Sequence, residues 1–146
     1  MNAKHILFPT DFSHTGDAAL AWATALARDA NATLHIVHVQ EPPMVYGGEM
    51  YYGMPEPNVE HLKEMLAKVV PTDPSVPCKH HLVSGAPATA ICRLAADENV
   101  DMIVIGTHGR TGVMRLLMGS VAEAVVRQAP CPVLTYKQPA EQTSEA

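Results

Sequence analysis

Short apolar runs alternate along this chain with longer segments whose apolar residues recur at helical spacing. His5–Pro9 is the first apolar run and predicts a β-strand. The segment His14–Ala30 then places its apolar residues on one face of a helix, which Ser13 would cap. The alternation continues and predicts strands over Thr33–Val39, Lys79–Val83, Met102–Ile105 and Pro132–Tyr136, and helices over Asn58–Val70, Pro87–Glu98 and Ser120–Gln128.

Five strands that alternate with four helices predict an α/β fold with a parallel sheet and right-handed crossovers. In such sheets ligands bind beyond the carboxyl ends of the strands, where the winding reverses. Two predicted strand ends carry unusual residues, Pro9-Thr10-Asp11 after the first strand and Gly106 after the fourth. The pattern leaves the strand order open. We expect one domain over residues 1–137 and a polar tail over 138–146.

One connection stands out. The segment Gln40–Pro57 holds four prolines, three glycines, three tyrosines and three methionines. Connections of this length are uncommon inside a compact domain. Tyrosine and methionine make adaptable contacts, which favour a lid over a bound ligand or a surface for a partner. A disordered excursion is an equally good interpretation of this segment.

Composition and charge narrow the classes of partner. The chain has 10 basic and 15 acidic residues, a net charge of −5, which argues against binding of nucleic acid or anionic membranes. No apolar run approaches the ~20 residues of a membrane span, and no signal sequence precedes the first strand. The three cysteines, Cys78, Cys92 and Cys131, have neither zinc-site nor redox spacing. We therefore expect a cytoplasmic protein with reduced cysteines.

A glycine pattern carries the candidate chemistry. Gly106 and Gly109 follow a predicted strand, and after nine more residues Gly119 and Ser120 open a predicted helix. Glycines let the backbone approach a phosphate, and a helix start offers unpaired N–H donors. No Gly-Lys-Ser/Thr sequence follows, and the pattern does not follow the first strand, so it is neither a Walker A loop nor a dinucleotide fingerprint. Ser120 and Glu123 also match a capping box.

The chain resembles single-domain universal stress proteins. The resemblance extends over almost the whole sequence, and its motifs are specific in combination. It rests on Lys4–Ser13, His38-Val39, Gly85-Ala86-Pro87, Asp101–Gly112, Leu116–Glu123 and Ala129–Leu134.

That family contains members that bind ATP and members that do not, and Gly-x2-Gly-x9-Gly-Ser/Thr marks the binders. The resemblance implies a Rossmann-like fold of the adenine nucleotide alpha hydrolase type, with sheet order 3-2-1-4-5 and helices on both faces. It also implies a homodimer paired through the strand Pro132–Tyr136. By position, Asp11 and Gly106 would lie at the ribose and the backbone of Val39 at the adenine. Gly109, Gly119, Ser120 and Val121 would hold phosphates, and Pro9, Thr10 and Ile105 would line the pocket.

Several assignments have structural alternatives. Asp11 could only close a turn, and Ser120 could only cap its helix. Arg110 lies in the phosphate loop and either neutralises charge there or is simply exposed. The eight histidines form no recognisable ligand set, so no resident metal is expected, although ATP could carry in a divalent ion such as Mg²⁺.

Three functions remain. The first is a stress-response ATP-binding regulatory module that acts through an unknown protein partner. The second is a weak ATPase or phosphotransferase, which would need a positioned nucleophile and strong charge neutralisation that the motif does not evidently offer. The third is a dimer that binds other proteins and no nucleotide. The intact glycine pattern argues against this function.

Overall fold

The computed structural model describes residues 2–13, 16–41, 58–107 and 119–137. The predicted tail, 138–146, lies outside these residues. Strands and helices alternate in the predicted order, and every strand end lies within one residue of its prediction. The elements are β1 (His5–Pro9), α1 (Asp17–Ala30), β2 (Thr33–Gln40), α2 (Val59–Ala67), β3 (Cys78–Ser84), α3 (Pro87–Asp97), β4 (Met102–Gly106), α4 (Ser120–Gln128) and β5 (Val133–Tyr136).

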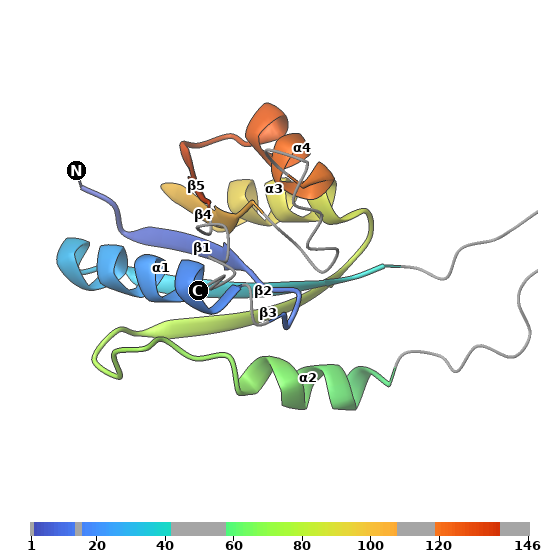
Figure 1. Ribbon diagram of the computed structural model, residues 1–146, viewed down its shortest axis with the longest axis horizontal. Coiled ribbons are helices and arrows are strands. Elements are labelled where there is room, and N and C mark those ends of the chain that lie inside the picture. Colours follow the sequence, from blue (N-terminus) through green and yellow to red (C-terminus); the bar gives the residue numbers. More distant parts are fainter. Residues whose placement is uncertain (1, 14–15, 42–57, 108–118, 138–146) are drawn as a thin grey trace, which may run out of the picture.

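The five strands form one parallel sheet in the order β3-β2-β1-β4-β5. Residues of α1 and α2 pack on one face of the sheet, and residues of α3 and α4 pack on the other. Figure 1 shows α3 and α4 together on the side away from α2. The winding reverses between β1 and β4, because the chain leaves β3 at one edge and returns to the middle of the sheet at β4. The predicted fold and strand order are confirmed.

The core consists of two apolar layers, one on each face of the sheet. Ile6 and Phe8 of β1 face α1 and α2, whereas Leu7 faces α3 and α4, as the alternation of side chains along a strand requires. The middle residues of β1 and β4 are fully covered, which is typical of strands in a parallel sheet with helices on both faces. None of the described helices is both long and apolar enough to span a bilayer.

The start of α1 differs from the prediction. The helix begins at Asp17, its N-cap is Gly16, and no side chain caps it. The predicted cap, Ser13, instead donates its hydroxyl to Asp11 Oδ1 and accepts the Gly16 N–H with its carbonyl. Ser13 is therefore part of the turn after β1, and this turn delays the helix. At the other end Asn31 adopts the left-handed conformation, with φ 58°, as expected of a helix C-terminus.

The second helix is shorter than predicted. Asn58 caps α2 by accepting the His61 N–H, but the helix ends at Ala67 and not at Val70. Pro71 disfavours helical backbone at the residue before it, so a helix that continues to Val70 is unfavourable.

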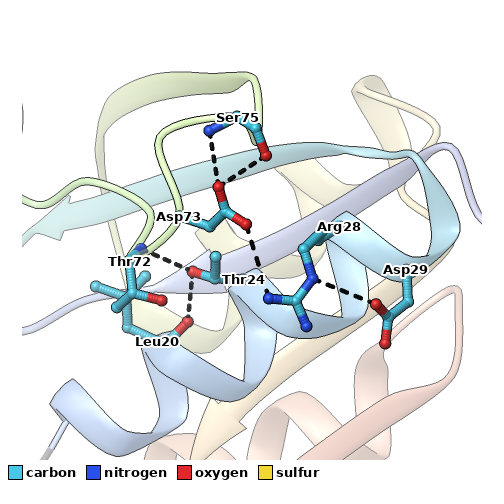
Figure 2. A network of polar contacts seen from close by, with 7 residues as sticks. All are labelled: Leu20, Thr24, Arg28, Asp29, Thr72, Asp73 and Ser75. Carbon is cyan, nitrogen blue, oxygen red and sulfur yellow. Dashed lines mark hydrogen bonds and ion pairs between the residues drawn. The ribbon is translucent and has the colours of Figure 1, made fainter.

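A polar network links the connection between α2 and β3 to α1 (Figure 2). The Thr24 hydroxyl donates to the Leu20 carbonyl at 2.8 Å and accepts the Thr72 N–H at 3.2 Å. Asp73 accepts both the N–H and the hydroxyl of Ser75, which lowers the pKa of its carboxyl, and it pairs with Arg28 at 3.7 Å. These contacts join α1 to the strand connection that leads to the β3 edge of the sheet.

Candidate functional site

The predicted site residues that the structure describes gather at the carboxyl edge of the sheet. Strands β1 and β4 are neighbours, with Ile6 opposite Met102 and Leu7 opposite Ile103. Because the strands are parallel, their carboxyl ends lie at one edge. Pro9 ends β1, Ile105 and Gly106 end β4, and Val39 lies next to the last residue of β2. The order β3-β2-β1-β4-β5 makes this edge the switch point at which ligands bind in such sheets.

The turn after β1 forms the first half of the candidate site. The Thr10 N–H donates to the Val37 carbonyl at 2.8 Å, which continues the pairing of β1 with β2 past Pro9. Asp11 Oδ1 accepts the Ser13 N–H at 2.9 Å and also the Ser13 hydroxyl. The turn-closing role of Asp11 is therefore present in the structure, and the same bonds hold its carboxylate at the sheet edge.

The second half joins the end of β4 to the start of α4. The Gly119 N–H donates to the Thr107 carbonyl at 2.6 Å, and the Thr107 N–H donates to the Tyr136 carbonyl of β5 at 3.0 Å. The first hydrogen bond brings Gly119 next to the end of β4, although residues 108–118 separate them along the chain. The first turn of α4 therefore begins at the carboxyl edge of the sheet.

The predicted capping box is wrong. Gly119 is the N-cap of α4 with φ −64° and ψ 155°, and no side chain caps the helix. Ser120 is the first helical residue and is exposed, while the Glu123 carboxylate pairs with Arg127 one turn later. The N–H groups of Ser120, Val121 and Ala122 belong to the first turn, which has no intrahelical acceptor for them. These donors carry the positive end of the helix dipole.

Sequence comparisons identify the family. The profile of the Universal stress protein family matches residues 2–137. The chain belongs to this family. Universal stress protein A homolog 1 of Coxiella burnetii is 38% identical over 141 residues, which cover 92% of this chain and 96% of that protein.

Solved structures of universal stress proteins share the fold. The structure of protein MJ0577 of Methanocaldococcus jannaschii, itself a universal stress protein, has a TM-score of 0.81 at 30% identity and covers 96% of this chain and 99% of that one. A universal stress protein in complex with cAMP has a TM-score of 0.71 at 21% identity and covers 93% of this chain and 98% of that one. The second likeness shows the fold alone.

Neither Gly106 nor Gly119 has a backbone conformation that requires glycine. Gly119 has a negative φ that any residue adopts. A Cβ at Gly106 would meet only Ala19 Cβ within 4 Å, at an ordinary contact distance of 3.9 Å. The described structure thus gives no steric reason for Gly106, and a ligand that approaches the backbone would give one.

Thr107 lies at the candidate site, although the sequence predicted it only as part of the loop. Its side chain is 3% exposed, and among the described residues its hydroxyl has no hydrogen-bond partner. A buried hydroxyl without a partner is unfavourable, and a bound water, ion or ligand would satisfy it. Sequence offered no signal for this role, because burial of Thr107 depends on how β4, β5 and α4 meet.

Other predicted features lie elsewhere. Gly109 and Arg110 fall outside the described residues, as does the 42–57 part of the Gln40–Pro57 connection. A hollow of about 390 Å³ lies between β1, α1 and α2, on the opposite face from α4. Of the predicted site residues that the structure describes, only Thr10 lines it. All three cysteines are free thiols, and burial raises the pKa of Cys92 and of Cys131, which makes these thiols less reactive.

Three of the eight histidines contact one another across the sheet, an arrangement that the sequence did not predict. His5 Nδ1 lies 3.0 Å from His35 Nε2, and His35 Nδ1 lies 2.9 Å from His81 Nε2. The three rings belong to the adjacent strands β1, β2 and β3, and His35 is fully buried. Each hydrogen bond uses a different nitrogen of His35, so the arrangement is a chain of rings. No group of three potential metal ligands is found among the described residues.

Proposed function

We propose that this universal stress protein is a regulatory module that binds ATP between the turn after β1 and the start of α4. The observation that carries the proposal is the hydrogen bond from Gly119 to Thr107, which places the first turn of α4 beside the end of β4. Phosphate oxygens would accept the N–H groups of Ser120 and Val121, which have no acceptor within the helix. Asp11 would accept from the ribose hydroxyls, and the backbone of Val39 would meet the adenine.

Three further observations support a nucleotide at this edge. The pattern Gly106, Gly109, Gly119, Ser120 is complete in the chain. Gly106 has no steric role among the described residues, and the buried Thr107 hydroxyl lacks a partner there. A universal stress protein of the same fold forms a complex with cAMP, another adenine nucleotide. Because this chain carries a net charge of −5, its overall electrostatic field repels phosphate, and local hydrogen-bond donors would hold the phosphates. Arg110, or a Mg²⁺ ion bound to ATP, would add positive charge beside them.

The proposed assembly is a cytoplasmic homodimer that pairs through β5. This strand is an edge of the sheet, and Leu134 on it is 39% exposed. An exposed apolar edge strand favours pairing with another chain. Light scattering of the wild type and of Leu134→Lys tests the dimer: we expect a dimer and a monomer, respectively.

Calorimetric titration with ATP tests the site. We expect the wild type to bind, and Gly119→Val and Gly109→Val to lose binding because a branched side chain enters the phosphate path. Gln128→Val is the control, because it adds the same branched side chain at an exposed position at the other end of α4. Unchanged affinity in both valine variants would refute the site. Steady phosphate release that disappears in Arg110→Ala would identify an enzyme instead of a module.

A further inference from the structure

His38 links the second strand to the turn that carries Asp11. It lies near the end of β2, is 8% exposed, and its Nδ1 is 2.9 Å from the Thr10 carbonyl oxygen. A carbonyl oxygen only accepts hydrogen bonds, so Nδ1 carries the hydrogen and donates it. His38 therefore links β2 to the backbone of the turn after β1, at a residue that follows the last residue of that strand.

The same imidazole ring packs against Phe12. The two ring centroids are 4.3 Å apart, and the ring planes are inclined at 34°. Phe12 has φ 65°, a left-handed conformation that is unfavourable for a residue with a bulky side chain. Its N–H donates to Thr10 Oγ1 at 3.1 Å. The ring of His38 thus supports a backbone conformation that local preferences of the chain would not maintain.

Asp11 lies between the two residues that His38 contacts. Its own carboxylate is oriented from the other side by the N–H and hydroxyl of Ser13. The backbone and the carboxylate of Asp11 are consequently held by two separate sets of contacts. His38 also shares the strand face of Leu34 and Ile36, which packs on α1 and α2, and so lies on the opposite face from α4.

From this geometry we propose that His38 is a positioning residue of the nucleotide site: it holds the Thr10–Phe12 backbone in the strained turn that presents Asp11 to the ribose, without touching the nucleotide itself. The inference rests on the proposed function. It predicts that affinity for an adenine nucleotide depends on the Nδ1–H donor and on the ring of Phe12.

Three variants separate this role from a general contribution to stability. His38→Leu removes the donor, and we expect ATP affinity to fall about tenfold, the effect of losing one net hydrogen bond. His38→Asn places an amide N–H at the same number of bonds from Cβ as Nδ1, so it should retain most of the affinity. His80→Leu is the control, because His80 Nε2 also contacts a backbone carbonyl, that of Val69, at 2.7 Å but on β3. It should leave ATP affinity unchanged.

The experiment combines calorimetric titration with ATP and ¹⁵N NMR of the imidazole nitrogens. In the nucleotide-free wild type, the NMR spectrum should show that Nδ1 of His38 carries a hydrogen. This result does not depend on any ligand. If His38→Leu does not fold, Phe12→Ala replaces it and should weaken binding while leaving the His38 bond intact. A wild type that does not bind ATP would refute the proposed function. A wild type that binds, with equal affinity in His38→Leu or in Phe12→Ala, would refute the positioning role alone.

Discussion

His35 Nδ1 lies 2.9 Å from His81 Nε2, and the two rings are stacked with centroids 5.1 Å apart. His5 contacts the other nitrogen of His35 at 3.0 Å. Burial, followed by the proximity of His81 and His5, lowers the pKa of His35 to about 4, while Glu98 opposes the shift. Burial also lowers the pKa of His81. The rings of His35 and His81 are therefore neutral in the folded protein at neutral pH.

Because the pKa of His35 is lowered on folding, we expect the stability of the protein to depend on pH. The unfolded protein takes up a proton on His35 near pH 6.5, whereas the folded protein does so only near pH 4. Because the unfolded state binds more protons in this window, the free energy of unfolding should fall as the pH decreases from 6.5 to about 4. The His35 contribution is about 3 kcal/mol at most. Urea unfolding at a series of pH values across the window measures it.

The variant His35→Gln should flatten this pH dependence, since glutamine can still hydrogen-bond but does not titrate. His61→Gln on the exposed side of α2 is the control and should retain the slope of the wild type. A slope in His35→Gln equal to that of the wild type would show that other groups cause the dependence. The N–H groups of Lys4 and His5 lower the pKa of the Asp101 carboxyl, so its contribution to stability is present above the unfolded-state pKa of 3.8 and is lost as the pH falls below that value.

Replacement of Ser120 by alanine distinguishes a role in helix stability from a role in ligand binding. A capping box would make Ser120→Ala cost about 1 kcal/mol of stability. The structure places Ser120 at the first helical position, exposed and without a capping bond, so we expect unfolding to change by less than about 0.5 kcal/mol. If its hydroxyl donates to phosphate, ATP affinity should fall about threefold to tenfold. Thermal unfolding and calorimetric titration of the same variant distinguish the two roles.

Thr24 is the central residue of the network on α1. Its side chain is 1% exposed, and its hydroxyl bonds both the Leu20 carbonyl and the Thr72 N–H. Thr24→Val keeps the shape but leaves the Thr72 N–H without this acceptor, so we expect a loss of about 1–3 kcal/mol in unfolding free energy. Thr89→Val at an exposed position of α3 is the control and should have a small effect. Equal effects of both changes would show that the network contributes little.

Asn31 ends α1 in the left-handed conformation with φ 58°. Asn31→Ala should lower the unfolding free energy by about 1 kcal/mol, because a Cβ without a local polar partner disfavours this conformation. Asn31→Gly should be neutral or stabilising, since glycine adopts positive φ without steric cost. Thermal unfolding of the two variants measures the difference, and a reversed order would contradict the backbone explanation.

The sequence by itself determined the α/β class, the order of the elements, and nearly all strand ends. Those features follow from local hydrophobic periodicity, and the apolar runs of β1 and β4 agree with burial on both faces. Family resemblance added the strand order, which the sheet confirms. It also supplied the candidate site, whose residues Pro9, Gly106 and Gly119 the structure brings to one edge, although their contact with a nucleotide stays a prediction.

Tertiary structure decided the features that depend on distant partners. Ser13 and Ser120 match cap patterns, but neither caps a helix. Ser13 bonds to Asp11, and Gly16 is the N-cap of α1. Gly119 bonds to Thr107 where the end of β4 meets α4, and it is the N-cap of α4. The contacts of His38 with Thr10 and Phe12, and the chain of three histidines, join strands that lie far apart in the sequence. Local spacing cannot reveal such contacts, because they arise only when the strand order and register place side chains from different strands together.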